Sequence, residues 1–168
     1  MKLRAIEEKT PLGIFSILFI SERSDEFIAL VSGFANTRSL RKKLPSLYRS
    51  LELEAHEEGH PLRDAIKSYF NGDHRAFSNV PLQIEGTRFQ EEIWNEIAKI
   101  KLGETISYRE LAGRSGHASA IRAAASACAL NRLVLLLPCH RIIRSDGSIG
   151  DYAFGKKRKE ALLRLERE

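Results

Sequence analysis

The residues whose type and spacing best suit covalent chemistry lie in the run Pro138-Cys139-His140-Arg141. A thiolate is a nucleophile, but a free thiol with a pKa of about 8.5 is only a few per cent ionised near neutral pH. A base within hydrogen-bond reach, directly or through one water, raises that fraction, and His140 is the adjacent candidate. Neighbouring side chains diverge, so we expect a water between them. The run predicts nucleophilic catalysis by Cys139, with a purely structural Cys-His pair as the alternative.

Cys128 is the only other cysteine in the 168 residues. No Cys-x-x-Cys pair or histidine cluster accompanies Cys139, so the sequence predicts no metal site. Two cysteines do not form a disulfide framework, which favours a reduced, intracellular compartment. We expect Cys128 to be a small core residue that is inert because it is buried.

Positive charge is concentrated around this run. The chain has 27 basic and 22 acidic side chains, and between residues 105 and 145 six arginines face one acid, Glu110. The planar fork of arginine binds phosphates and stacks on bases, so the cluster favours nucleic acid as a partner over an ordinary solvated face. No apolar stretch reaches the roughly 18–20 residues that cross a bilayer, and acids at Glu7 and Glu8 argue against a secretory leader.

The first half of the chain predicts a small α/β lobe that ends near residue 80. Residues 12–20 and 26–34 are rich in β-branched and aromatic side chains, which is typical of strands. The basic run 38–43 predicts a short surface helix, and the stretch 46–60 is polar and weakly patterned. Residues 61–70 begin with proline and precede Gly72, which predicts a helix.

The second half predicts helices around a tight turn. Thr87 and Gln90 form a capping-box pattern that opens a helix running to Gly103. Ser107 opens a short second helix in the same way, residues 115–117 form a turn, and residues 118–130 form an alanine-rich helix. A short helix, a glycine turn and a second helix are typical of a helix-turn-helix.

Two further segments are expected to hold Cys139. Residues 133–137 are continuously apolar and predict a buried strand that ends at the proline. Residues 156–166 predict a closing helix with Ala161, Leu162 and Leu165 turned inward. Glu166, near the end of this helix, could orient a histidine, and a solvated carboxylate is the alternative.

Together these residues resemble the O6-alkylguanine-DNA alkyltransferases, also called methylated-DNA–protein-cysteine methyltransferases. The run from Pro138 to Ile143 is similar to the active-site signature of that family. The resemblance is dense over residues 66–168 and thin before them. Its other matching residues are Tyr69-Phe70-Asn71-Gly72, Gly86-Thr87-Arg88-Phe89-Gln90, Trp94, Gly103 to Tyr108, Arg122-Ala123, Gly147, Gly150, Tyr152 and Leu162-Leu163 to Glu166.

The resemblance implies an α/β (α+β) fold of two lobes: a ribonuclease-H-like lobe over residues 1–80, and a winged helix-turn-helix lobe over residues 81–168 that binds DNA and carries Cys139. It implies DNA repair by direct reversal, in which the alkyl group of O6-alkylguanine, and of O4-methylthymine, moves irreversibly to Cys139. Each molecule would act once, without a cofactor or metal. The implied partner is duplex DNA, entered through the minor groove with the base rotated out, as chemistry on a base requires. The resemblance also implies that the protein is a monomer in the cytoplasm or on the nucleoid.

The resemblance also implies a role for individual residues. Cys139 would accept the alkyl group, His140 would be its base through a water, and Glu166 would orient His140. Asn131 would brace the cysteine-bearing turn, and Tyr108 would donate to the departing guanine. The implied DNA contacts are Arg122, as the finger that fills the gap in the duplex, with Tyr108, Ala123, Ser119 and Arg141. The implied pocket residues are Ile142, whose carbonyl would read the guanine amino group, with Tyr152, Ala153 and Val134.

Four positions depart from the family pattern. Ala125 and Ser126 replace glycines, Arg132 replaces a proline, and Phe154 replaces a glycine at the pocket rim, where it would narrow access for bulky groups. Two other classes of function remain open. A lesion-sensing protein without chemistry is disfavoured by the intact cysteine, and a winged-helix transcription regulator leaves the Pro138–Arg141 run unused.

Overall fold

The computed structural model describes residues 1–23, 26–54 and 59–168, and its contacts divide the chain into two compact units. Residues 1–83 with 132–136 form the first unit, and residues 84–131 with 137–168 form the second. The first unit therefore ends close to the expected boundary, but it also takes in five residues that we expected in the second lobe. Among the described residues, no helix has the length and apolarity to cross a bilayer.

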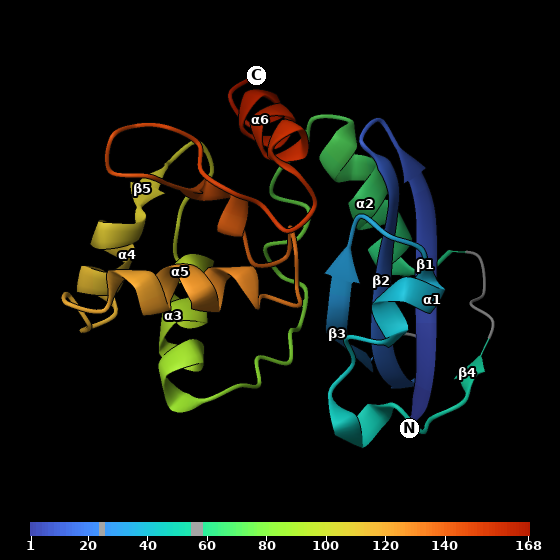
Figure 1. The fold of residues 1–168 in the computed structure, drawn as a ribbon. Coiled ribbons are helices and arrows are strands. Elements are labelled where there is room, and N and C mark those ends of the chain that lie inside the picture. Colours follow the sequence, from blue (N-terminus) through green and yellow to red (C-terminus); the bar gives the residue numbers. More distant parts are fainter. Residues whose placement is uncertain (24–25, 55–58) are drawn as a thin grey trace. The chain divides into compact units, whose positions relative to one another are not determined.

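The first unit is built on a four-stranded sheet of order β3-β2-β1-β4 (Figure 1). β1, β2 and β3 are antiparallel neighbours, and β4 pairs with β1 in parallel. The elements of this unit are β1 (Lys2–Thr10), β2 (Gly13–Arg23), β3 (Glu26–Gly33), α1 (Thr37–Arg41), the 3-10 helix η1 (Ser46–Tyr48), β4 (Leu53–Glu54) and α2 (Pro61–Phe70). The predictions for β2, β3, α1 and α2 are confirmed.

β1 was not predicted, and its burial pattern explains why. Its fully buried residues are Leu3 and Ile6, three positions apart, so the strand lacks the alternation of period two that marks a strand in sequence. β2, by contrast, is buried continuously from Phe15 to Ser21, so its side chains are covered on both faces of the sheet. The residues 55–58 of the weakly patterned stretch lie outside the described part of the chain.

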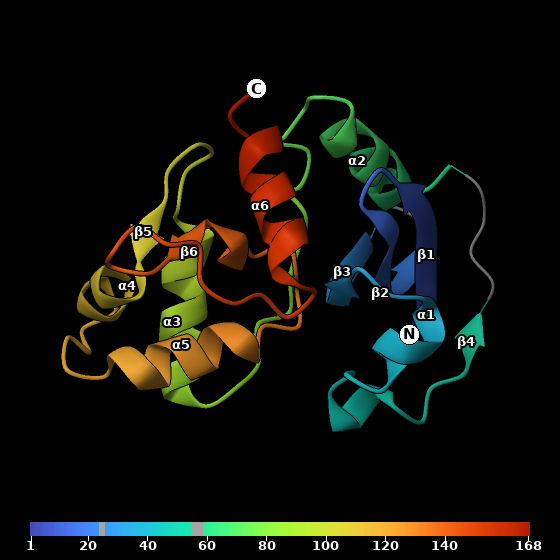
Figure 2. The same ribbon diagram turned by 45° about the horizontal axis from the view of Figure 1, so that its top comes forward.

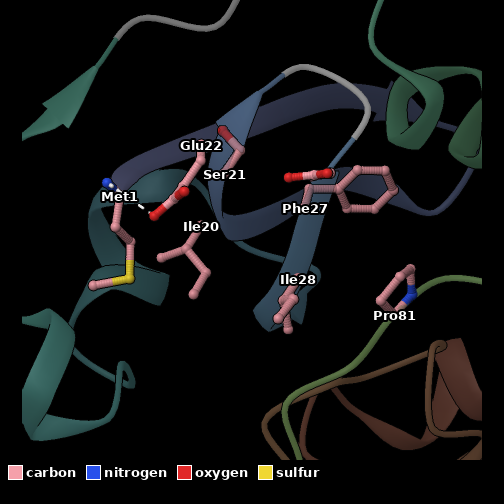
Figure 3. A pocket seen from close by; sticks show the side chains of 8 residues that line it. Met1, Ile20, Ser21, Glu22, Phe27, Ile28 and Pro81 are labelled. Atoms are coloured by element: carbon pink, nitrogen blue, oxygen red, sulfur yellow. Dashed lines mark ion pairs between the residues drawn. The ribbon is translucent and has the colours of Figure 1, made fainter.

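An apolar cavity of about 540 Å³ opens beside β2 and β3 (Figure 3). Ile20, Phe27 and Ile28 line it together with Met1, whose terminal amino group lies 3.8 Å from a carboxylate oxygen of Glu22. The eight residues that line the cavity include no cysteine and no histidine, so it does not hold the predicted chemistry.

The second unit contains the predicted helix-turn-helix, which is confirmed. α3 and α4 each pack against α5, and the short strands β5 and β6 pair in parallel (Figure 2). The elements are α3 (Arg88–Ala98), β5 (Ile106–Ser107), α4 (Tyr108–Arg114), α5 (Ile121–Ala129), the 3-10 helix η2 (Cys139–Arg141), β6 (Ile142–Ile143) and α6 (Lys156–Leu165). The segment between β6 and α6 forms the loop of the wing.

The start of α3 follows its sequence closely. The Gln90 N–H donates to Thr87 Oγ1 over 3.3 Å, and the Thr87 N–H donates to Gln90 Oε1 over 2.9 Å, which confirms the capping box. Trp94 Nε1 donates to the Ala127 carbonyl over 2.9 Å and so ties α3 to α5. α3 ends at Ala98 rather than at Gly103. The Lys99 and Ile100 N–H groups donate three residues back, to the Glu96 and Ile97 carbonyls, instead of four residues back as in an α-helix.

Two segments beside α5 differ from the prediction. α5 begins at Ile121 rather than at residue 118, because the Ala120 N–H closes a turn onto the His117 carbonyl. Residues 133–137 are buried, as expected, but do not form a strand. Leu133 makes an isolated bridge with Ser32, and the chain then turns through Leu135, whose φ of 69° is left-handed. A continuous apolar run indicates burial but does not distinguish a strand from another buried segment.

Candidate active site

Cys139 is held at the start of η2 by its own turn and by Asn131. The Cys139 N–H donates to the Leu137 carbonyl over 2.8 Å, and the Arg141 N–H donates to the Pro138 carbonyl over 3.0 Å. Asn131, which follows α5, donates from Nδ2 to the Leu137 carbonyl and to Cys139 Sγ, both over 3.1 Å. One amide therefore fixes the turn and the sulfur together.

The Cys139 thiol is almost fully buried. Burial raises the pKa of this thiol, and the hydrogen bond from Asn131 and the positive charge of Lys159 oppose that rise. The sulfur is therefore protonated at neutral pH. A base that removes the proton is needed before it can act as a nucleophile.

His140 and Arg141 share one carboxylate, that of Glu166. His140 Nε2 lies 2.9 Å from Glu166 Oε1. Arg141 donates from Nη2 to Glu166 Oε1 and from Nε to Oε2, each over 2.9 Å, and from Nη1 to the Ile100 carbonyl over 2.7 Å. All three side chains are buried, so this paired, charge-assisted contact is shielded from water.

Burial and the neighbouring charges together set the protonation of Glu166 and His140. Burial would raise the pKa of Glu166, but the hydrogen bonds from His140 and Arg141 outweigh it and hold that pKa well below its usual range. Burial lowers the pKa of His140, although Glu166 opposes the change. At neutral pH the group therefore contains a carboxylate, a guanidinium and a neutral imidazole.

A neutral imidazole carries one proton, and the hydrogen-bond network assigns it to a nitrogen. His140 Nε2 faces the Glu166 carboxylate, which only accepts, so the proton belongs on Nε2. Nδ1 is then the basic nitrogen. It is buried and has no hydrogen-bond partner among the residues that the structure describes.

The predicted contact between Arg141 and DNA stays a prediction, and the structure gives this side chain other partners. Arg141 is 9% exposed, and its guanidinium is engaged by Glu166 and by the Ile100 carbonyl. Arg141 instead supplies the charge that balances Glu166.

Tyr108 begins α4 and lies against the wing. A Cβ atom on Gly150, whose φ is +75°, would lie 3.5 Å from Tyr108 Cε2. The Nζ atom of Lys159 lies 5.7 Å from the centre of the Tyr108 ring. Burial raises the pKa of Tyr108 to about 12, so its hydroxyl remains a hydrogen-bond donor at neutral pH.

Lys159 is the site residue that the sequence analysis missed. It is fully buried, and its Nζ donates to the Asp151 carbonyl over 3.2 Å. The buried residues of α6 are Lys159, Leu162 and Leu163, whereas Ala161 and Leu165, which we expected inward, are only half-buried. Positions 159, 162, 163 and 166 share one face of the helix, and this spacing is the signal that the sequence offers. A lysine in the first turn of a helix is normally solvated, so Lys159 was not expected on the buried face.

The predicted DNA contacts on α5 are accessible. Ser119 lies in the turn before the helix, and Arg122 and Ala123 lie in its first turn; all three are exposed. Ser126 Oγ donates back to the Arg122 carbonyl over 3.1 Å, so the departure at Ser126 is accommodated on the helix surface.

The predicted pocket residues do not all lie in one unit. Ile142 is buried in β6, and Tyr152 and Ala153 follow in the wing, where the Tyr152 and Phe154 rings lie 6.4 Å apart between centres. Val134 belongs to the first unit, where its carbonyl accepts from Ser32 Oγ over 2.7 Å. The other predicted pocket residues therefore belong to the second unit and Val134 does not, and the pocket itself stays a prediction.

Among the described residues, no group of three or more His, Cys, Asp and Glu side chains is arranged to hold a metal ion. The absence of a metal remains a prediction.

Comparison with known proteins identifies the family. The domain described as "6-O-methylguanine DNA methyltransferase, DNA binding domain" matches residues 88–168. The methylated-DNA–protein-cysteine methyltransferase of Shigella flexneri is 34% identical over 170 residues, which cover 98% of this chain and 96% of that protein. The bifunctional transcriptional activator/DNA repair enzyme Ada of Escherichia coli is 48% identical over 89 residues, which cover 53% of this chain; the match spans a quarter of Ada, 25% of its length.

Solved structures agree with this result. The structure of Mycobacterium tuberculosis OGT in complex with DNA superposes with a TM-score of 0.74 at 26% identity, over 98% of this chain and 93% of that one. The predicted two-lobe α/β fold is thereby confirmed. The chain belongs to the methylated-DNA–protein-cysteine methyltransferase family.

Proposed function

We propose that this chain repairs DNA by direct reversal, moving the alkyl group of O6-alkylguanine in duplex DNA to the sulfur of Cys139. The observation that carries the proposal is the buried arrangement in which Asn131 holds the Cys139 sulfur while Glu166 holds the neighbouring His140. The relatives described above, a methylated-DNA–protein-cysteine methyltransferase and a DNA repair enzyme, support the same reaction.

In the proposed reaction His140 is the general base. Its neutral Nδ1 takes the thiol proton through one water, while Glu166 and Arg141 keep the imidazole oriented. The Cys139 sulfur then attacks the alkyl carbon. A sulfur–carbon bond forms as the carbon–O6 bond breaks, the electron pair leaves with guanine, and guanine takes up the proton that the thiol lost.

The Tyr108 hydroxyl, protonated at neutral pH, donates to the departing base. The product is a thioether, which no later step reverses. Each chain therefore acts once and needs no cofactor. The same chemistry extends to O4-methylthymine, where an alkyl group also sits on a base oxygen.

DNA binding is proposed for the exposed side of α5. Ser119 and Ala123 present small side chains to the minor groove, and Arg122 enters the duplex where the flipped base leaves a gap. The solved relative in complex with DNA supports this partner. Residues 81–168 would carry both binding and chemistry, in a monomer that works in a reduced, intracellular setting in the cytoplasm or on the nucleoid, where its thiol stays free.

The test is intact-mass analysis and peptide mapping after incubation with a duplex that contains O6-methylguanine. We expect one added methylene per chain, located on Cys139, and the same gain in the matched variant Cys128→Ala. Cys139→Ala should bind the duplex with salt dependence but gain no mass. A label on Cys128, or consumption of far more lesion than protein, would overturn the proposal. Binding without any mass gain in the unsubstituted protein would favour a lesion-sensing protein instead.

A further inference from the structure

Lys159 is a buried cation that the reaction described above does not use. It has no exposed surface, and lysine is almost never fully buried unless it is paired, because its ammonium loses its hydration. Its Nζ contacts the Asp151 carbonyl at 3.2 Å and the face of the Tyr108 ring at 5.7 Å from the centre. Neither contact brings a negative charge, and Lys159 forms no ion pair with a carboxylate in the part of the chain that the structure describes.

The fold places this cation on the face of α6 that also carries Glu166. α6 packs against η2, the short helix that begins with the cysteine. Lys159 and Glu166 are seven residues apart and so share one face of the helix, separated by about 10 Å along its axis. Glu166 contacts His140 and Arg141 of η2, which shows that this face of α6 is the one directed at the cysteine-bearing helix.

The charged and titratable groups around Lys159 come from four other elements. They are Cys139 of η2, Cys128 of α5, Tyr108 of α4, and Asp151 and Arg144 of the wing. Burial lowers the pKa of Lys159 to about 8, and among the groups that oppose this effect Cys139 is the strongest. Arg144 repels the ammonium, and Asp151 is itself exposed and lies 3.6 Å from Arg144.

We propose that Lys159 is the counter-ion of the Cys139 thiolate: its ammonium stabilises the sulfur anion that forms when His140 takes the thiol proton. Lys159 is thus a positioning residue that acts on the charge of the nucleophile, separately from the His140–Glu166 pair. An opposite charge nearby favours the ionised form of a thiol. The identity of the electrophile, an alkylated base, rests on the proposed function. The effect of Lys159 on the ionisation of Cys139 can be measured in the free protein without DNA.

The experiment uses a Cys128→Ser background, in which Cys139 is the only thiol. The rate at which iodoacetamide alkylates Cys139 is followed by intact mass from pH 6 to pH 10. Thiolate absorbance near 240 nm, with Cys139→Ala as the blank, gives the thiolate fraction at each pH independently. The variants are Lys159→Met, which keeps the length but removes the charge, Lys159→Arg, which keeps the charge, and Lys157→Met, which removes an exposed lysine from the same helix.

For Lys159→Met we expect alkylation at pH 7.5, where Lys159 is charged, to slow about tenfold, and the rates of the parent and the variant to converge towards pH 10, where Lys159 has lost its proton. Lys159→Arg and Lys157→Met should be alkylated at pH 7.5 within about twofold of the parent rate. An unchanged rate at pH 7.5 in Lys159→Met would overturn the proposal. So would a rate reduced equally at every pH, because that is the result of a purely structural role.

A parallel arm with the O6-methylguanine duplex separates this inference from the proposed function. If the parent protein gains no methylene but Lys159→Met still slows iodoacetamide alkylation at pH 7.5, the proposed function fails and the counter-ion stands. If transfer occurs and the alkylation rate at pH 7.5 does not change, the counter-ion fails and the proposed function stands.

Discussion

The first unit and the second unit bury different kinds of polar side chain. Among the described residues, the buried polar side chains of the first unit are three serines and His60. Those of the second unit are Asn131, His140, Arg141, Lys159 and Glu166. Four of these five carry ionisable groups, and all five lie in contact with Cys139 or with its 3-10 helix, or on the face of α6 directed at that helix.

This difference separates scaffold from site. Burying a charge costs free energy even when it is paired, so buried charges are weak evidence for stability and better evidence for function. Substitutions in the core of the first unit should therefore change stability alone. Substitutions in the buried charged group should change reactivity, and should change stability in a direction that depends on whether the charge has a partner.

The largest effect is expected for Glu166→Gln. The amide NH2 of glutamine would replace Glu166 Oε2 and so face the Arg141 Nε–H, donor against donor, and the guanidinium is left buried without its counter-charge. We expect the transfer rate to fall at least about a hundredfold and the free energy of unfolding to fall by about 3–5 kcal/mol. Single-turnover transfer to a methylated duplex and urea unfolding measure the two effects.

The matched change in the first unit is Ile17→Val, which shortens a fully buried side chain of β2. It should lower the free energy of unfolding by about 0.5–1.5 kcal/mol and leave the transfer rate per folded molecule unchanged. A Glu166→Gln protein that transfers at the parent rate would contradict the distinction between the units.

Arg141→Gln tests the pH dependence of the site. The positive charge of Arg141 lowers the pKa of His140, so its removal should raise that pKa. A histidine with a raised pKa is already protonated at a higher pH, and a protonated histidine accepts no further proton. As the solution is acidified, the transfer rate of the variant should therefore begin to fall at a higher pH than that of the parent. The transfer rate should therefore fall more steeply between pH 8 and pH 6 in Arg141→Gln than in the parent protein. The same pH profile in both proteins would show that Arg141 has no effect on the base.

Lys159→Met should stabilise the protein, which is the reverse of what a truncation in the first unit does. Burial lowers the pKa of Lys159 from 10.5 to about 8 in the folded chain. The unfolded chain therefore holds this proton more tightly, and the resulting penalty is fully present below pH 8 and fades as the pH approaches 10.5. At pH 7 the variant should be more stable by up to about 3 kcal/mol, and at pH 10 by much less.

Urea unfolding at the two pH values measures this difference. Lys157→Met, which removes an exposed lysine from the same helix, should leave stability unchanged at both. A loss of stability in Lys159→Met at pH 7 would mean that the ammonium is better satisfied in the folded state than its contacts indicate.

The same contrast explains what could be predicted from the sequence. Pro61 and the Thr87–Gln90 box mark helix starts through local contacts, and the helices begin there. The burial of Arg141 depends on a carboxylate 25 residues away, and that of Lys159 on elements brought together by the fold. Local rules place a charged side chain in solvent by default, so they fail where distant partners hold it inside. The turn at Leu135 is missed for a related reason, since an apolar run reports burial without conformation.

The last prediction concerns Gly86, which lies outside the buried charged group and next to the start of α3. A Cβ atom there would lie 2.5 Å from Trp94 Cζ3 and 2.8 Å from Cη2. The ring cannot retreat freely, because Trp94 Nε1 donates to the Ala127 carbonyl of α5. Gly86→Ala should therefore lower the free energy of unfolding by about 1–3 kcal/mol and shift the fluorescence of Trp94, the only tryptophan in the sequence.

Gly113→Ala is the control for Gly86→Ala, because a Cβ atom at Gly113 meets nothing within 4 Å. Gly113 lies in α4, so alanine there should raise the free energy of unfolding by about 0.5–1 kcal/mol and leave the fluorescence of Trp94 unchanged. Asn131 follows α5 four residues after Ala127, so any shift of α5 that Gly86→Ala causes should reach the Cys139 sulfur through the Asn131 amide. A fluorescence shift with an unchanged rate of Cys139 alkylation would show that the ring moves alone and that α5 holds its place without it.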